Sequence, residues 1–487
     1  MDNTHRNILQ DIARKAMIAR GLEPDFSAAE LNELTKITLP AIYRSEISKD
    51  LRNLLWCSID NACSLDLDQL SYAEPLPGKK TRLLVAVADV DALVTAESGI
   101  NNHACINTAS VYTIAQVFPM LPDKLSASLT SLSLDSDRCS VIVDMVVCDD
   151  GAIEESSVYL ATVCNHAKLE YNSIAAWIEG TGSIPSEITS INGLAENLKL
   201  QDQVAQKMKV LRHNNGALDF ETDKASPVFD GDYLSEMKVD NKNRANAMIE
   251  EFMIAANGAT ARYLTGKKFP SLRRVVRTPK RWDRIVELAS ENGFSLPETA
   301  DSKSLSQYIR FIKQKEPLRF TEMSINVLKL LGSGEYVAET PDSVSPGHFG
   351  LAVKDYEHST APNRRYPDLI TQRLLKSAIT GRPVPYTPQQ LEEIAHHCTL
   401  KASDVRKVER QVEKSANAML MESRIGEVFD AVVSGASPKG TWIRILHPHM
   451  EGKLIRGFIG LEVGHKIKAR LTYTNVADGF IDFEKIN

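Results

Sequence analysis

Three aspartates stand close together in SIDNACSLDLDQ, residues 58–69. Asp66 and Asp68 are two positions apart, so an extended backbone directs both carboxylates to one face. Asp60 reaches the same face if residues 61–65 form a tight loop. Crowded carboxylates repel one another, and a hard divalent cation with oxygen ligands relieves that repulsion. The pattern predicts a metal site, although a solvated turn would use the same residues.

A second stretch, YEHSTAPNRRYPDL at residues 356–369, carries two adjacent arginines. Pro367 and Asp368 suit the first turn of a helix, which places Arg364 and Arg365 at its start. A guanidinium group is a planar fork that matches phosphate oxygens. The plainer alternative is a surface ion pair between Arg364 and Asp368. Metal-binding carboxylates and a phosphate-binding arginine together indicate phosphodiester chemistry.

The elements that position these motifs follow from hydrophobic periodicity. Amphipathic stretches at 6–20 and 27–38 predict a short helical element, with Ser27 capping its second helix. Apolar runs at 82–94 and 139–150 predict buried strands. A sheet therefore follows the first helices.

Helical periodicity returns at 174–212 and dominates beyond Asn246, most clearly at 246–264 and 402–421, with a basic strand-and-turn segment at 267–284. The last 64 residues are predicted to form about five short strands of a small antiparallel barrel. Its expected turn glycines are Gly435, Gly440, Gly452, Gly464 and Gly479.

Size and composition are those of a globular chain with room for two to four domains, since 487 residues include 43% hydrophobic and 25% charged ones. No apolar run of 18 residues is present, and the mixed charges of the N-terminus argue against a secretory signal, so we expect a cytoplasmic location. Seven cysteines without a C-x-x-C pair argue against a disulfide framework. The net charge of −6 means that any nucleic-acid surface must be local.

Both motifs resemble the catalytic domain of the ribonuclease II family of 3′→5′ exoribonucleases. The acidic stretch is similar to the family's I-D-x(5)-D-x-D-D run, and the arginine stretch to its Y-x-H-F-T-S-P-I-R-R-Y-P-D-L. Further similar stretches, in order, are FPMLPDKLSASLTSL (118–132), GALDF (216–220), MIEEFMIAANGATARYL (248–264) and RRVVRTPKRWDRIVEL (273–288). The resemblance implies an α+β fold, in which a mixed catalytic domain surrounds an RNA channel and a barrel of the oligonucleotide-binding (OB) type follows.

The resemblance also implies three parts. Residues 1–48 form a helical element in place of the cold-shock barrels of classical members, 49–422 the RNB-type catalytic domain, and 423–487 the OB-like RNA-binding barrel. Since those barrels narrow the access channel, we hypothesise that the more open channel admits structured RNA or shifts the substrate preference.

By this resemblance, Asp60, Asp66 and Asp68 hold Mg²⁺, or Mn²⁺ in its place, against the scissile phosphate. Asp68 and Arg364 are the expected catalytic residues, the arginine stabilising charge that develops on the phosphate. The expected reaction hydrolyses single-stranded RNA from its 3′ end to nucleoside 5′-monophosphates. We expect a monomer without membrane contact or an obligate protein partner.

Further residues match RNA contacts of the family. Tyr112 and Phe220 would stack the 3′-terminal bases, Glu251 would contact a ribose hydroxyl or an ordered arginine, and Glu409 would lie near the leaving nucleotide. Core packing of Tyr112 and of Phe220 and a helix-surface ion pair of Glu409 are the plainer alternatives.

Two more surfaces are candidates for RNA. Trp442 and Phe458, on expected barrel strands, can stack bases or fill the barrel core. A basic run can line the strand channel or form a solvated face; it comprises Lys267, Lys268, Arg273, Arg274, Arg277, Lys280, Arg281 and Arg284.

Besides the helical element at 1–48, the chain departs from the family pattern at two places. Gln69 replaces the fourth aspartate of the acidic run and removes a negative charge. Ser359, Ala361 and Asn363 replace the usual Phe, Ser and Ile, a change expected to loosen how Arg364 is held. Two alternatives to the exoribonuclease therefore stay open: a catalytically weakened or inactive RNA-binding protein of the same family, and a phosphodiesterase that acts on DNA.

Overall fold

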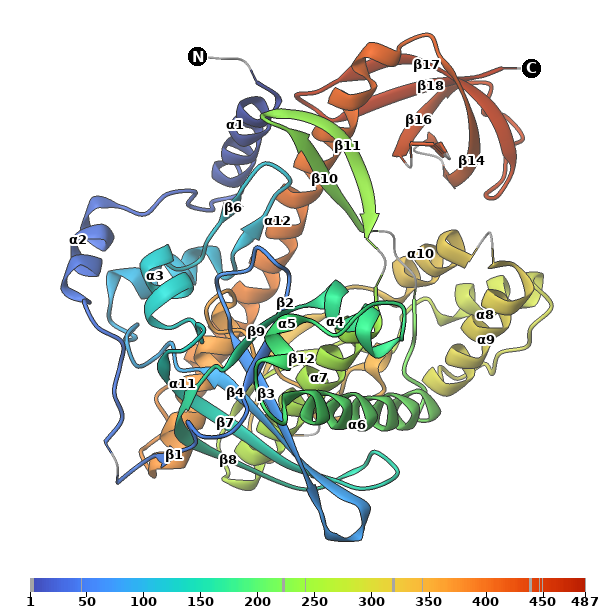
Figure 1. Ribbon diagram of the computed structural model, residues 1–487. Coiled ribbons are helices and arrows are strands. Elements are labelled where there is room, and N and C mark those ends of the chain that lie inside the picture. Colours follow the sequence, from blue (N-terminus) through green and yellow to red (C-terminus); the bar gives the residue numbers. More distant parts are fainter. Residues whose placement is uncertain are drawn as a thin grey trace.

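A central body of sheet and helices carries a β-barrel at one end, and both ends of the chain lie on the barrel's side (Figure 1). The computed structural model describes residues 4–44, 46–220, 224–240, 242–317, 320–343, 345–437, 440–445, 447–448 and 450–486. The α+β class and the five-stranded C-terminal barrel are confirmed.

The chain starts with two helices, α1 (His5–Ile18) and α2 (Ala28–Lys36), as predicted. Ser27 caps α2: its side chain accepts from Glu30 N, and the Glu30 side chain accepts from Ser27 N. On α1, Leu9, Ala13 and Met17 are buried at helical spacing, so one face of this helix packs on the body while α2 buries no residue.

A seven-stranded sheet forms the centre, in the order β1-β8-β7-β4-β3-β2-β9. The β1–β8 and β2–β9 pairs are parallel and the other pairs antiparallel. Its strands are β1 (Lys49–Asp50), β2 (Cys57–Asp60), β3 (Gln69–Leu76), β4 (Lys80–Ala88), β7 (Asp137–Val147), β8 (Ile153–Cys164) and β9 (Ala167–Glu170). The strands predicted at 82–94 and 139–150 are β4 and β7, but β4 ends at Ala88 because Asp89 accepts from Ala92 N and turns the chain.

Three two-stranded ribbons surround the sheet, namely β5 (Val111–Tyr112) with β6 (Val117–Phe118), β10 (Lys224–Asp230) with β11 (Tyr233–Asp240), and β12 (Ser271–Val275) with β13 (Glu335–Glu339). No element was predicted for the β10–β11 ribbon, which reaches α1 and α12 (Figure 1).

Helices cover the sheet and extend to the barrel. They are α3 (Gly99–Asn107), α4 (Tyr171–Ile178), α5 (Ser186–Thr189), α6 (Leu194–Asn214), α7 (Arg244–Gly266), α8 (Trp282–Glu291), α9 (Ser302–Lys315), α10 (Phe320–Leu331), α11 (Tyr366–Thr380) and α12 (Pro388–Met421). The helix predicted at 402–421 is only the second half of α12. Its first half buries few apolar residues, Leu391, Ala395 and Cys398, so its periodicity is weak.

The barrel is closed, in the order β14-β15-β16-β18-β17. Its strands are β14 (Val428–Ser437), β15 (Gly440–Ile445), β16 (Met450–Arg456), β17 (Lys466–Asn475) and β18 (Phe480–Ile486). Two predicted turn glycines are wrong. Gly435 lies in β14 at an irregular pairing, and Gly452 lies inside β16, where an added Cβ would be 2.4 Å from the Phe483 ring.

The barrel sits directly on α12. Gly479, in the turn between β17 and β18, has a φ of +68°, and an added Cβ would lie 2.6 Å from Lys414 Cβ of α12. One apolar cluster contains buried residues of α1, α12, the β5–β6 ribbon and the barrel, such as Met17, Val412 and Phe429. These parts therefore share a core.

All seven cysteines are free thiols. Within the described ranges, no helix is long and apolar enough to cross a bilayer.

Candidate active site

The three predicted metal ligands lie on the loop that joins the neighbouring strands β2 and β3. Asp60 ends β2, and its Oδ1 accepts from Asn61 N at 2.8 Å and from Ser64 Oγ at 2.9 Å. The predicted tight loop is confirmed. Asp66 and Asp68 follow it, and Asp68 is buried, with 1% of its surface exposed.

Asp68 meets the arginine stretch from the far part of the chain. Arg364 Nε donates to Asp68 Oδ2 at 3.0 Å, and Asn363 N donates to Asp68 Oδ1 at 2.9 Å. The alternative ion pair between Arg364 and Asp368 is not formed, because Asp368 pairs with Arg365 at 2.7 Å.

Burial dominates the electrostatics of Asp68. It raises the pKa of this carboxyl to about 7, although Arg364 and the Asn363 N–H act in the opposite direction. The negative charge of Asp66 adds to the effect of burial. Burial is the largest effect on Arg364 and lowers the pKa of the guanidinium, but Asp68, Tyr112, Asp60 and Asp66 together outweigh burial and raise it, so Arg364 stays cationic. A further cation near Asp68 would favour its ionised form.

Tyr112 joins the acidic loop to α12. Its hydroxyl donates to Asp66 Oδ2 at 3.2 Å, and its backbone N–H donates to Glu409 Oε1 at 3.0 Å. Tyr112 is 44% exposed, so part of its side chain is accessible to a base. The structure thus brings Asp60, Asp66, Asp68, Tyr112, Arg364 and Glu409 together.

Backbone pairing fixes the segment before Tyr112 to the arginine stretch. Ser110 N donates to Arg364 O at 3.0 Å, and Tyr366 N donates to Thr108 O at 2.8 Å. Tyr112 and Arg364 are therefore held in one register.

The expected loosening around Arg364 is not supported. Thr130 Oγ1 donates to the buried Asn363 side chain at 2.6 Å. Ser359 donates to Asn257 Oδ1 through its N–H and its hydroxyl, each at 2.9 Å. The Ser359 side chain and the amide oxygen of Asn363 are thus hydrogen-bonded, while Asn363 Nδ2 is buried without a partner among the described residues.

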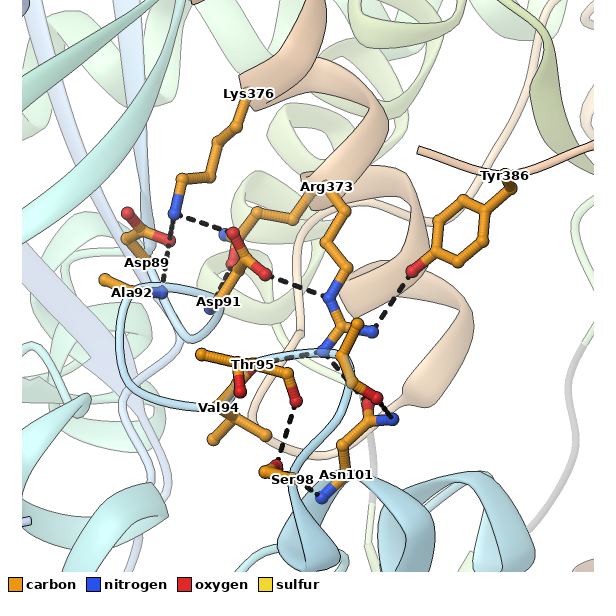
Figure 2. A network of polar contacts seen from close by, with 12 residues as sticks. Asp89, Asp91, Ala92, Val94, Thr95, Ser98, Asn101, Arg373, Lys376 and Tyr386 are labelled. Carbon is orange, nitrogen blue, oxygen red and sulfur yellow. Dashed lines mark hydrogen bonds and ion pairs between the residues drawn. The ribbon is translucent and has the colours of Figure 1, made fainter. Parts of the chain in front are cut away.

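A buried polar network ties α11, which begins just after Arg364, to the end of β4 (Figure 2). Lys376 Nζ lies 2.9 Å from Asp89 Oδ1 and 2.8 Å from Asp91 Oδ2. Arg373 Nε donates to Asp91 Oδ1 at 2.9 Å, and its Nη2 donates to Asn101 Oδ1 at 2.9 Å. Because β4 pairs with β3, this network fixes the start of α11 relative to Asp68.

Three residues predicted to stack bases lie elsewhere. Phe220 packs against the apolar cluster of α8, α9 and α10, as its plainer interpretation expected. Trp442 is half-buried on β15, where its ring lies beside Gly435 and Gly440. Phe458 is not on a strand; it follows β16 in a turn and is 44% exposed.

Glu251 also faces away from the cluster. Arg212 Nε and Nη2 donate to its carboxylate at 3.0 and 2.5 Å, and Glu251 is 4% exposed in the wall of a cavity of about 320 Å³. The predicted contact with an ordered arginine is present. Glu250 precedes Asn257 by seven positions, so these two share the α7 face that contacts Ser359.

The basic run does not form one surface. Arg273 is buried and its Nε lies 3.1 Å from Glu339, while Arg277 pairs with Glu335. Lys267 lies over the ring of Tyr263.

No motif pointed to Tyr171, the first residue of α4. Burial raises the pKa of its hydroxyl, Asp60 adds to this effect and Arg364 opposes it, so Tyr171 borders the acidic cluster. Tyr171 lies just before the stretch 174–212 for which helical periodicity is predicted.

The oxygen donors of the acidic loop suit a hard divalent cation. The carboxylates of Asp60 and Asp66 each retain an oxygen without a hydrogen bond to the described residues, while both oxygens of Asp68 are bonded. The three side chains are not gathered as tightly as a preformed ligand set. Among the described residues, only Glu23, Glu30 and His103 offer three ligand atoms within 4.8 Å of one another.

That second trio does not fit a metal. Asn107 Oδ1 accepts from Glu23 N and its Nδ2 donates to Glu23 O, both at 2.8 Å, which fixes the amide. Its Nδ2 also faces His103 Nε2 at 3.0 Å, so Nε2 is the acceptor and the neutral ring carries its proton on Nδ1, toward Glu23. A metal on Nδ1 would displace that proton to Nε2. The Nε2–H and the Asn107 Nδ2–H would then be two donors facing each other. The trio instead attaches the N-terminal segment to α3.

Comparison with known proteins gives the following matches. A family model described as RNB domain matches residues 48–381, and one described as RNase II-type exonuclease C-terminal S1 domain matches residues 427–486. Ribonuclease R 1 of Lactococcus lactis subsp. lactis (strain IL1403) is 28% identical over 466 residues, and the match covers 89% of this chain and 56% of that protein. The chain spans about half the length of the curated relatives it matches.

Solved structures share the fold. Mycoplasma genitalium RNase R, in complex with ribose methylated single-stranded RNA, gives a TM-score of 0.87 at 22% identity over 98% of this chain and 78% of that one. Yeast Ssd1, described as a pseudonuclease, gives 0.70 at 16% identity over 93% of this chain and 56% of that one. The fold is thus found in a protein described as RNase R and in one described as a pseudonuclease.

Proposed function

We propose, from the premise that this chain belongs to the RNB-domain family, that it is a 3′→5′ exoribonuclease acting on single-stranded RNA. The protein hydrolyses the RNA from its 3′ end and releases nucleoside 5′-monophosphates. The homologues named Ribonuclease R support the reaction class.

One observation carries this proposal: Arg364 Nε bonds Asp68 at 3.0 Å while Tyr112 bonds Asp66 at 3.2 Å. A binding protein needs RNA-stacking rings and cations, but it has no need of a buried carboxylate beside them. A phosphodiesterase needs all three kinds of group around one phosphate.

Arg364 orients and stabilises the phosphate. It uses Nε for Asp68, and its side chain remains 42% exposed, so the Nη nitrogens can donate to phosphate oxygens. Loss of such a donor costs a reaction about 3–4 kcal/mol of transition-state stabilisation. Asp68 in turn holds the guanidinium in place.

Tyr112 positions the 3′-terminal nucleotide. Its ring stacks on the base while its hydroxyl holds Asp66 and its N–H holds Glu409. Deeper in the chain's RNA path we place Phe220, and on the barrel Trp442, as proposed stacking residues. We assign Glu251 an indirect role through Arg212.

Asp60, Asp66 and Asp68 are proposed to hold Mg²⁺, with Mn²⁺ as an alternative. When bound, such ions activate water and stabilise the leaving oxygen of an in-line displacement. Gln69, at the start of β3, offers an amide oxygen in place of a fourth carboxylate.

The proposed organisation is a helical element at 1–48, a catalytic domain at 49–422 and an RNA-binding barrel at 423–487. The first family match, 48–381, begins one residue before the second part and ends inside it, and the other match, 427–486, lies inside the third part. We propose a monomer in the cytoplasm, and the free thiols suit such a reducing compartment.

Degradation of 5′-labelled single-stranded RNA tests the proposal. Purified protein with Mg²⁺ or Mn²⁺ should shorten the RNA from its 3′ end, EDTA should stop the reaction, and a DNA strand of the same sequence should persist. Arg364→Met should lose cleavage, while Asp342→Asn, at an exposed turn after β13, should not.

Other outcomes would replace the proposal. RNA binding without shortening in either ion would identify a binding protein that lost its chemistry at Gln69. Equal cleavage of RNA and DNA would identify a less selective phosphodiesterase.

A further inference from the structure

Arg274 on β12 carries a charge that the described chain does not neutralise. Its side chain forms no hydrogen bond and no ion pair within the described ranges, and its Nη1 is buried without a partner. Its neighbours in the basic run differ: Arg273 pairs with Glu339 and Arg277 with Glu335. Buried cationic groups without a counter-charge are costly, so this one needs an explanation.

The guanidinium is held in place by packing. It lies over the ring of Tyr336, 4.7 Å from the ring centre, and Tyr336 OH bonds His358 Nδ1 at 2.8 Å. On its other side stands Gly334, where an added Cβ would be 2.8 Å from Arg274 Nη2. The site is therefore shaped around this side chain.

The cations near Arg274 act on it with the same sign of charge. Burial is the largest cause that lowers the pKa of Arg274, the hydroxyls of Tyr336 and Tyr356 act in the opposite direction, and Arg406 and Arg365 lower it further. The positive charge of Arg274 also acts on His348. Burial is the largest cause and Arg274 the next, and together they lower the pKa of this histidine to about 4. Arg365 has one carboxylate partner, Asp368, and its Nε is buried without a partner. Positive charge is thus in excess.

Two chain connections place this group of arginines beside the candidate active site. Arg365 directly follows Arg364, which bonds Asp68. Arg406 stands three positions before Glu409 on α12, one helical turn away, and Glu409 bonds the N–H of Tyr112.

We propose that Arg274, with Arg365 and Arg406, forms a phosphate-binding subsite next to the scissile position. The occupant is a phosphate group, either of the RNA backbone or of the released nucleoside 5′-monophosphate. The inference rests on the proposed function, since that function supplies the ligand. A phosphate group would supply the hydrogen-bond acceptors that Arg274 lacks among the described residues.

Thermal unfolding of the metal-free full chain tests the subsite without any cleavage. Inorganic phosphate should raise the melting temperature of the wild type and not that of Arg274→Met. Without phosphate, Arg274→Met should melt at or above the wild-type temperature, because it removes an unpartnered charge. Arg277→Met, the matched control, should respond to phosphate as the wild type does.

Binding of single-stranded RNA in EDTA supplies the second readout. The salt dependence of the binding constant should weaken in Arg274→Met by about 0.7 in logarithmic slope, the value of one phosphate contact on a single strand. Arg274→Lys keeps the charge and should keep the slope, which guards against a folding defect. Competition by uridine 5′-monophosphate with an unchanged RNA slope would identify the product as the occupant.

An equal response of wild type and Arg274→Met to phosphate, to the monophosphate and to salt would overturn the subsite. These assays need no catalysis, so their failure is separate from failure of the proposed function. The opposite outcome is also informative. If the RNA stays uncut but phosphate raises the melting temperature of the wild type and not of Arg274→Met, the phosphate subsite is supported and the proposed exonuclease activity is rejected.

Discussion

Arg364 Nε lies 3.0 Å from Asp68 Oδ2, although the two residues are 296 positions apart in the chain. The contact is possible because β3 and β4 are paired and the polar network of Figure 2 locks α11 to the end of β4. The pair leaves Asp68 with both oxygens engaged and a pKa of about 7. Its chemistry therefore depends on which cations surround it.

Asp68→Asn should abolish RNA cleavage and leave RNA binding within about twofold of wild type, because the amide keeps the shape of the side chain while losing its charge. Gel assays of cleavage and fluorescence anisotropy of binding measure the two effects. Retained cleavage would show that the acidic loop is not the metal site.

The metal-free protein should lose stability as the pH rises from about 4 to about 7. The pKa of Asp68 is raised to about 7 in the folded state, against an ordinary value near 3.9. Within this window the folded state keeps a proton that the unfolded state has released, so the free energy of unfolding falls with rising pH.

Urea unfolding at pH 5 and pH 8 measures this change, and Asp68→Asn is the comparison. The variant should lose less free energy of unfolding between the two pH values. Other groups in this window, such as Glu357 with a pKa raised by burial to about 8, are common to both proteins. Identical losses in both would show that Asp68 does not titrate here. Stabilisation by Mg²⁺ should be greater at pH 8 than at pH 6, since the ligand must be ionised.

Tyr112→Ala should weaken binding of the RNA 3′ end by roughly 5- to 150-fold, the equivalent of about 1–3 kcal/mol for one stacked base. Tyr112→Phe keeps the ring and should keep most of the affinity, while losing the bond to Asp66. Anisotropy titrations in EDTA measure both. Equal losses in the two variants would assign the effect to the hydroxyl and not to stacking.

Glu250 and Glu251 should behave differently because they lie on different faces of α7. Glu251→Ala leaves Arg212 buried without its partner and should cost about 3–5 kcal/mol of unfolding free energy. Glu250→Ala removes a partly exposed ion pair with Lys242 and should cost less than about 1 kcal/mol.

Denaturant unfolding checks the stability of both variants. RNA binding then tests the faces, since Glu250 shares the side of Asn257 and Ser359. We expect Glu250, and not Glu251, to lie on the side of α7 that faces the RNA. A larger loss of RNA affinity in a folded Glu251→Ala than in Glu250→Ala would reverse this assignment.

Local signals explain what could be predicted. Ser27 with Glu30 carries its own capping geometry, and the apolar run of β4 needs no distant information. The acidic loop and Arg364 could be assigned to one site only through the resemblance to a family, because nothing local relates residues that meet across the fold.

Other features depend on tertiary partners. Which glutamate of α7 meets the site depends on the rotation of that helix, and both are plausible from an apolar pattern that flanks them equally. Gly452 resembles a turn glycine in sequence, yet it makes room for Phe483 across the barrel. The excess of positive charge near Arg274 depends on Arg365 and Arg406, which are distant from it in the sequence, so no local pattern could predict it.

The contact of Gly479 with Lys414, and the apolar cluster that continues from Met17 through Val412 to Phe429, have a practical consequence. The C-terminal unit is not an appendage that can be trimmed away cleanly. A truncation after Met421 would expose apolar side chains on the last turns of α12. Such a fragment should self-associate, so an assay on it would report a damaged molecule and not the contribution of the missing unit.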